Sequence, residues 1–175
     1  MRSILVATDG SALSAKALVR SIEMAKQFDA KLTVVNVVDV RPVREAVRYL
    51  EQVRLPGSEV LGLAPMPLTF PAAYDLNALD SLDLLDNQSR ALAQRVSDYI
   101  LAGALQAAQS AGLADVHTVS ASGDPAKQIV ATAEAIGADL VVLGRRGLTG
   151  LTELVLGSVS QKVLLHAPVD VFVAS

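Results

Sequence analysis

The chain has 175 residues, a length typical of one domain, and 51% of them are hydrophobic, which is enough for a substantial core. Its formal net charge of −3 and its aromatic content of 3% exclude both the positive surface and the stacking platforms of a typical nucleic-acid-binding protein. The absence of cysteine excludes disulfides, thiolate zinc sites and cysteine nucleophiles.

The sequence contains no segment suited to a membrane. No apolar run approaches the about 20 residues that a membrane-spanning helix needs. The apolar start, 4–7, is too short for the core of a signal peptide and is soon followed by Asp9. We therefore expect no membrane insertion and a cytoplasmic location.

The N-terminal part has the pattern of a strand, a helix and a second strand. The short run 4–7 favours a strand. Ser11 is a suitable N-cap for a helix over 12–28, where apolar residues recur at helical spacing. The almost continuously apolar run 31–38 predicts the second strand, as expected for a sheet covered on both faces.

A proline-rich insert, about 41–74, interrupts this alternation and contains five of the seven prolines. We expect a short helix over 44–54 and an irregular loop over 55–74. Because the insert follows the second strand directly, a lid over the ligand edge and a dimer contact both stay open as its role. The whole chain, 1–175, is expected to form a single domain with this insert.

The second half resumes the alternation of helices and strands. Asp124-Pro125 is a strong helix start, with aspartate at the N-cap and proline at the first helical position, and Gly137 is a suitable stop. The predicted elements are a helix over 81–111, a strand over 116–121, a helix from Asp124 to Gly137, a strand over 139–143, a helix over 158–166 and a strand over 169–174. The expected buried face of the first of these helices consists of Leu85, Leu92, Val96, Tyr99, Ile100 and Leu105.

Strands that alternate with helices indicate an α/β protein with a doubly wound parallel sheet. For five strands, right-handed crossovers predict the Rossmann-like order 3-2-1-4-5. The first and fourth strands then lie side by side at the point where the winding reverses, and ligands bind beyond the carboxyl ends of the strands there. Asp9 and Gly144 both fall at that edge.

A glycine-rich stretch follows the fourth predicted strand. Two arginines separate Gly144 from Gly147, and after nine more residues Gly157-Ser158 begins a helix. Backbone N–H groups in such a loop can approach a phosphate closely, and the helix start adds its dipole. The stretch has neither the P-loop pattern nor G-x-G-x-x-G after the first strand. It therefore predicts a phosphate site of another kind.

Simpler interpretations of these residues stay open. The loop could be a plain connection between a strand and a helix. Arg145 and Arg146 could neutralise β- and γ-phosphates, or they could simply be solvated. Asp9 is a candidate ligand of Mg²⁺, or a turn former and helix cap. No catalytic role is assigned to His117 or His166.

The spacing G-x2-G-x9-G-[S/T] resembles that of the universal stress protein family. Matching segments at 6–11, 34–39, 123–130 and 168–173 extend the resemblance over the chain except for the insert. It implies an adenine nucleotide alpha hydrolase-like fold and the ATP-binding branch of the family, with ATP, ADP or AMP as ligand. The implied nucleotide-binding residues are Ala7, Thr8, Asp9, Val37, Gly123, Leu143, Gly144, Arg145, Arg146, Gly147, Gly157, Ser158, Val159 and Ser160.

The resemblance also implies how these residues share the nucleotide. The glycines of the loop, Ser158 and Ser160 would hold the phosphates and ribose, and the Val37 main chain would contact adenine. The resemblance further implies a homodimer through antiparallel pairing of the last strand, 170–174. This is physically consistent, because an unpaired apolar edge strand invites association.

Three functions stay open from the sequence. The first is a stress-response or signalling regulator whose nucleotide state a protein partner recognises; without an evident general base, any ATP hydrolysis should be slow. The second, a nucleotide-transferring enzyme, would need another motif after the first strand, where 7–11 reads Ala-Thr-Asp-Gly-Ser. The third is a ligand-free interaction module, which the intact glycine spacing disfavours.

Overall fold

The computed structural model describes residues 1–38, 82–147 and 156–175. The predicted helix over 44–54 and loop over 55–74 lie outside them. The elements are β1 (Ser3–Ala7), α1 (Ala12–Phe28), β2 (Lys31–Val38), α3 (Leu82–Ser110), β3 (Val116–Ser122), α4 (Pro125–Ile136), β4 (Leu140–Gly144), α5 (Ser158–His166) and β5 (Asp170–Ala174).

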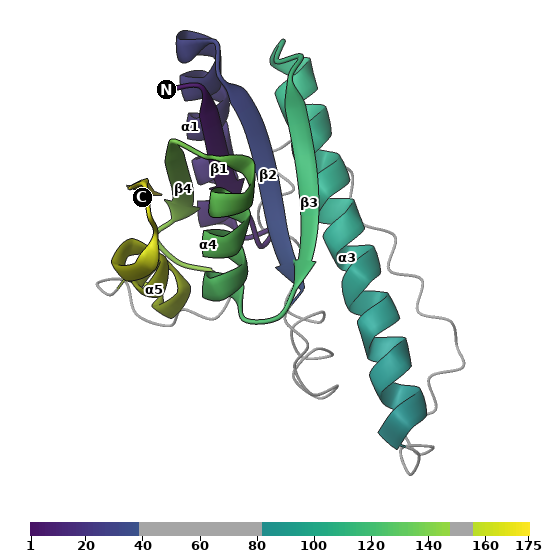
Figure 1. Ribbon diagram of the computed structural model, residues 1–175. Coiled ribbons are helices and arrows are strands. Elements are labelled where there is room, and N and C mark those ends of the chain that lie inside the picture. Colours follow the sequence, from purple (N-terminus) through teal and green to yellow (C-terminus); the bar gives the residue numbers. More distant parts are fainter. Residues whose placement is uncertain (39–81, 148–155) are drawn as a thin grey trace.

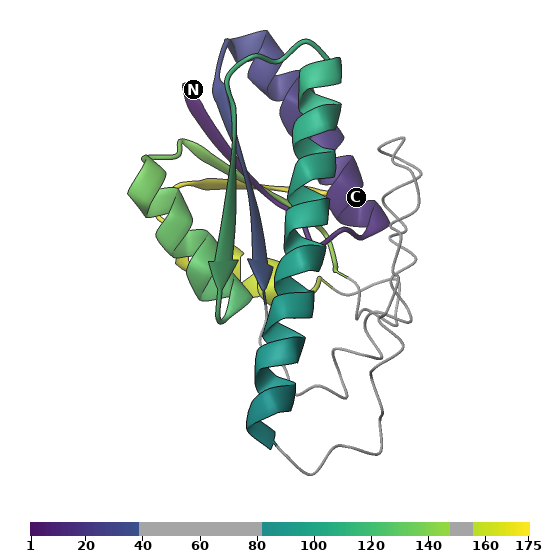
Figure 2. The same ribbon diagram turned by 90° about the vertical axis from the view of Figure 1, so that its right-hand side faces the viewer.

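The five strands form one parallel sheet in the order β3-β2-β1-β4-β5, which confirms the predicted α/β fold and strand order (Figure 1). Helices α1 and α3 pack on one face, and α4 and α5 pack on the other (Figures 1 and 2). The carboxyl ends of β1 and β4 are neighbours, as the predicted reversal of winding requires. None of the described helices combines the length and apolar composition that crossing a bilayer requires.

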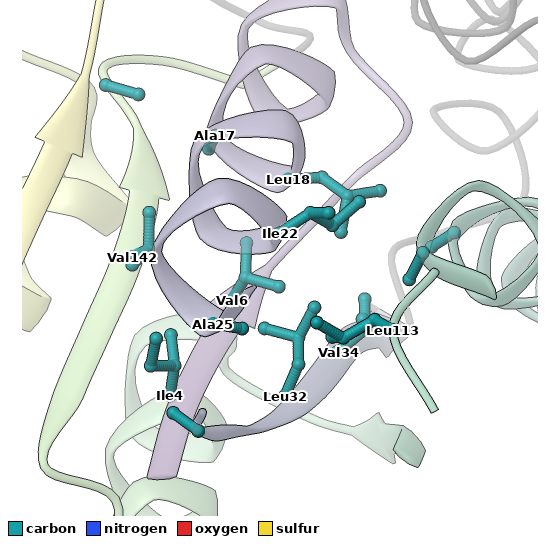
Figure 3. Packing of buried hydrophobic residues seen from close by; sticks show 14 of the residues in the cluster. Ile4, Val6, Ala17, Leu18, Ile22, Ala25, Leu32, Val34, Leu113 and Val142 are labelled. Carbon is teal, nitrogen blue, oxygen red and sulfur yellow. The ribbon is translucent and has the colours of Figure 1, made fainter. Parts of the chain in front are cut away.

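Successive side chains of a strand point to opposite faces of the sheet, so the core is divided into two clusters. Ile4 and Val6 of β1 face α1 and α3, where Leu18 is fully buried against them (Figure 3). Leu5 points to the opposite face and packs with Ile129 of α4. Burying each such aliphatic side chain contributes about 1.5–3 kcal/mol, so both helix layers are held mainly by apolar contact with the sheet.

The predicted helix ends are confirmed where short-range chemistry sets them. The Ser11 side chain accepts a hydrogen bond from the Ser14 N–H at the start of α1. Asp124 accepts one from the Lys127 N–H at the start of α4, and Gly137 ends that helix in the left-handed conformation. The start of β4 differs by one residue from the prediction: it begins at Leu140, and the Asp139 carboxylate just before it accepts hydrogen bonds from the N–H groups of Arg2 and Ser3.

The long helix α3 packs through smaller residues than the sequence pattern suggested. Val96 and Ile100 are buried as predicted, whereas Tyr99 and Leu105 are only half-buried. Fully buried Ala104 and Ala108 take the central places. Leu85 and Leu92 lie outside the side chains that the structure describes. The N-terminal part of α3 extends past the carboxyl ends of β2 and β3 in both views (Figures 1 and 2).

Candidate functional site

The turn between β1 and α1 is fixed by internal hydrogen bonds. The Thr8 N–H donates to the Val35 carbonyl at 2.9 Å, and the Asn36 side-chain amide donates to the Thr8 carbonyl at 2.7 Å. The Thr8 hydroxyl lies 3.1 Å from that of Ser14. Both main-chain groups of Thr8, an expected ligand contact, therefore form hydrogen bonds within the protein. The sequence did not lead us to predict this role of Asn36, although a single amide side chain in an otherwise apolar strand indicates a specific hydrogen bond.

Asp9 and the glycine loop meet at this edge, as the strand order predicted. One carboxylate oxygen of Asp9 accepts a hydrogen bond from the Ser11 N–H at 3.0 Å, so Asp9 does stabilise the turn. The other oxygen faces Gly147 so closely that a Cβ atom on Gly147 would collide with it. Gly147 therefore has a steric reason for being glycine, and the carboxylate lies beside the loop backbone.

Gly144 has a packing role that the sequence did not predict. A Cβ atom there would lie 2.8 Å from the Leu13 carbonyl carbon and 2.9 Å from the Ser14 nitrogen. These are main-chain atoms of the first turn of α1, which cannot easily move. The Gly144 carbonyl accepts a hydrogen bond from the Ser160 hydroxyl at 2.9 Å. Gly144 thus permits close packing of β4 against α1 and anchors α5.

The main chain of Arg145 joins three elements. Its N–H donates to the Ala174 carbonyl at the end of β5 at 2.8 Å, and its carbonyl accepts from the Gly157 N–H at 2.9 Å. The Arg145 Nε is buried and has no hydrogen-bond partner in the described part of the chain. A buried donor in this condition is unfavourable unless a ligand supplies an acceptor. The Arg145 Nε is therefore a donor that an anionic ligand could satisfy.

The start of α5 has no side-chain cap. Gly157 is the N-cap and has no side chain to accept a hydrogen bond. The first intrahelical donor is the Gln161 N–H, which bonds the Gly157 carbonyl at 2.9 Å. Helix geometry thus leaves the N–H groups of Ser158, Val159 and Ser160 without an intrahelical acceptor. Together with the positive end of the helix dipole, they can bind an anion.

The side chains around this helix start differ in their access. Ser158 is exposed and Val159 is half-buried, whereas Ser160 is buried with its hydroxyl proton donated to Gly144. Leu143 is also buried and belongs to the core cluster under α4 and α5, and Ala7 packs against that cluster. Ser158 is therefore the expected contact whose side chain is most accessible to a ligand.

Val37 and Gly123 border the other side of the same edge. Odd-numbered residues of β2 direct their main-chain groups toward β1, as the Lys31 N–H to Arg2 carbonyl bond at 2.9 Å shows. Val37 follows this alternation, but β1 has already ended at Ala7. Its main-chain groups thus face the space beyond β1. Gly123 has a φ of 128°, which favours glycine, and its N–H bonds the Val38 carbonyl at 3.1 Å.

The chain is similar to known proteins over its whole length. The sequence profile of the universal stress protein family matches residues 1–175. A putative universal stress protein of Staphylococcus aureus is 30% identical over 174 residues, which are 98% of this chain and 82% of the relative.

Solved structures agree with this match. A universal stress protein described as a complex with cAMP is 26% identical, with a TM-score of 0.58 over 99% of this chain and 97% of the other. The universal stress protein UspA from Lactobacillus plantarum has a TM-score of 0.69 at 24% identity, over 99% and 97% of the two chains. The one from Archaeoglobus fulgidus in complex with dAMP has a TM-score of 0.56 at 16% identity, over 100% and 98%. The latter two support the fold alone.

Proposed function

The chain belongs to the universal stress protein family, and we propose that it is an ATP-binding stress-response regulator within that family. ATP, or a related adenine nucleotide, would bind at the carboxyl edge of the sheet. A protein partner would then recognise the nucleotide-bound state. Slow ATP hydrolysis is compatible with this function but is not needed for it.

The observation that carries the proposal is the uncapped start of α5 beside the loop that follows β4. Ser158 and the two residues after it supply N–H groups, and Arg145 supplies a buried donor that has no acceptor among the described residues. Gly147 keeps the loop backbone close to Asp9. Backbone N–H groups at a helix start and a guanidinium donor on the loop bonded to that helix suit a phosphate chain.

The adenosine part would lie toward β2 and β3. Val37 offers main-chain hydrogen-bonding groups beyond the end of β1, and Gly123 allows a ligand to approach the backbone closely. The solved relative described as a cAMP complex, at 26% identity, supports an adenine nucleotide as the class of ligand. Asp9 would act as one carboxylate ligand of Mg²⁺ beside phosphate oxygens, the arrangement that this ion favours.

Rapid hydrolysis is not expected from the described residues. Of the two histidines, His117 bonds the Asp115 carboxylate near the start of β3 at 2.9 Å, and His166 ends α5. Both places are remote from the carboxyl edge of the sheet. The edge can bind phosphates and neutralise their charge, but no histidine there activates a water molecule.

Thermal unfolding with and without nucleotide tests the proposal. A ligand that binds only the folded state adds about 2.7 kcal/mol of stability at one hundred times its Kd, so ATP should raise Tm. Gly147→Ala should reduce this rise, because the added Cβ displaces the Asp9 carboxylate. Because only a side-chain end must move, the variant should still fold. No shift with millimolar ATP, ADP, AMP or cAMP would refute nucleotide binding.

We also propose that two copies associate through β5. This is an edge strand, and Phe172 on it is 38% exposed. A charged side chain there, as in Phe172→Asp, should shift the mass measured by light scattering from dimer to monomer. Leu165→Ser is a matched control, since Leu165 is 72% exposed but lies on α5. A Phe172→Asp variant with the wild-type mass would exclude this interface.

A further inference from the structure

A lysine on α5 pairs with the aspartate that caps α4. The Lys162 Nζ lies 3.7 Å from the Asp124 Oδ2, and the two side chains are 58% and 41% exposed. The other carboxylate oxygen of Asp124 accepts the Lys127 N–H at 3.0 Å. The two oxygens therefore serve different purposes: Oδ1 caps α4, and Oδ2 faces the neighbouring helix.

The position of Lys162 brings its charge to the ligand edge. It lies four residues after Ser158 and so shares a face of α5 with it. Side chains on a helix tilt toward its N-terminus. The pairing with Asp124, at the start of α4, shows that the ammonium group reaches this edge, where α4 and α5 lie side by side (Figure 1). The lysine thus adds a positive charge near the open N–H groups of α5.

The pairing of Lys162 with Asp124 is easily exchanged. Its distance exceeds the about 2.7–3.2 Å of an N–H···O hydrogen bond, and exposed ion pairs contribute little to stability. Asp124 does not depend on it, because the Lys127 N–H is the main cause that lowers the pKa of the Asp124 carboxyl group, and Lys162 is a lesser one. Lys162 can therefore leave Asp124 without uncapping α4.

We propose that Lys162 is a specificity residue that selects nucleotides by the length of their phosphate chain. It leaves Asp124 when a phosphate chain reaches the first turn of α5, and pairs with the terminal phosphate instead. A triphosphate, which carries more charge and extends farther than a monophosphate, gains more from this exchange. The proposal rests on the proposed nucleotide site and adds to it the reason for preferring ATP over AMP.

Calorimetric titration of the full chain with ATP and with AMP tests this role. Lys162→Met should weaken ATP binding about tenfold. A loss of this size lies between the effects expected for two charges about 4 Å apart in bulk water and near a protein surface. AMP binding should fall much less. Lys162→Arg should retain most of the ATP affinity, and Asp124→Asn, which frees the lysine, should strengthen ATP binding. Lys127→Met is the matched control: it removes an equal charge near Asp124 but on the capped helix, and both affinities should stay unchanged.

The possible outcomes separate this role from the function itself. If wild-type protein binds ATP and Lys162→Met binds it equally well, Lys162 does not select for phosphate. Equal losses for ATP and AMP would also overturn the proposal, since they would indicate a general effect on the site. If wild-type protein binds neither nucleotide, the proposed function fails. Thermal unfolding of Lys162→Met without ligand checks that this exposed substitution leaves the fold intact.

Discussion

Helices α4 and α5 begin at the same edge and on the same face of the sheet, yet their first turns are stabilised in opposite ways. Asp124 and Pro125 give α4 a complete start, with a carboxylate that accepts a hydrogen bond from the first turn. Gly157 gives α5 no such acceptor. The N-cap residue thus decides whether the first N–H groups of a helix bond to a side chain of the protein or can bind a ligand.

The open start of α5 is stabilised from outside the helix. The Gly157 N–H donates to the Arg145 carbonyl, and the Ser160 hydroxyl donates to the Gly144 carbonyl. Both acceptors belong to the end of β4 and the residue after it. The preceding strand and loop therefore hold the start of α5 in place without a side-chain cap.

A substitution at Gly144, whose carbonyl supports α5, should reduce stability more than any other change considered below. Gly144→Ala would place a Cβ atom 2.8 Å from the main chain of α1. Overpacking of this kind typically costs about 1–3 kcal/mol, which denaturant unfolding would measure. Gly147→Ala is the matched control, because it collides only with the end of the Asp9 side chain and should cost much less stability. Equal losses of stability in the two variants would show that the contact with α1 does not restrict position 144 to glycine.

Transferring the α4 cap to α5 should remove the difference between the helices. In Gly157→Asp, a carboxylate would occupy the N–H groups and repel phosphate. We expect ATP to bind about tenfold more weakly than to Gly157→Ala, a change of about 1.4 kcal/mol. Alanine is the necessary reference, since any Cβ here lies 3.2 Å from the Arg146 Cα. Equal affinities of the two variants would place the phosphates elsewhere.

Removing the cap from α4 should lower stability without weakening ATP binding. Asp124→Ala leaves the Lys127 N–H without its acceptor, so Tm should fall by a few degrees, as is usual when a cap is lost. ATP affinity should not fall, because α4 does not bind the phosphates. A strong loss of affinity in this variant would mean that the two helix starts act together on the ligand.

The smallest effect is a difference in pH dependence. The Lys127 N–H lowers the pKa of Asp124, and the N–H groups of Arg2 and Ser3 lower that of Asp139. A lowered folded-state pKa contributes stability that is present above the unfolded value of about 3.9. This stability is lost as the pH falls through the folded value. An Asp124→Asn, Asp139→Asn double variant should therefore lose less stability on acidification below about pH 4 than the wild type. Parallel acid unfolding curves would contradict this.

Local chemistry made much of the fold predictable from the sequence. Ser11 and Asp124 cap helices by contacts within three residues, and the order of strands follows from their alternation with helices. We could predict that Asp9 lies close to the glycine loop, because parallel strands bring their carboxyl ends to one edge of the sheet. The proximity of Asp9 to Gly147 could therefore be expected from the sequence.

What the sequence did not reveal depends on close approach between distant segments. Gly144 resembled a ligand contact, but its lack of a side chain serves the contact with α1. Likewise, Ala104 and Ala108 lie at the centre of the α3 interface because the helix approaches the sheet closely, which an apolar pattern alone cannot show. Asn36 supports the β1 turn through a bond across strands. Each of these roles is set by distances that spacing along the chain does not encode.

The two main-chain bonds of Arg145 have a mechanical consequence. A single residue holds the last residue of β5, Ala174, on one side and the first residue before α5, Gly157, on the other. The two attachment points lie within one residue, so a shift of the Arg145 main chain acts on both the end of β5 and the N-cap of α5. The ligand edge is thus mechanically coupled to the outer strand of the sheet.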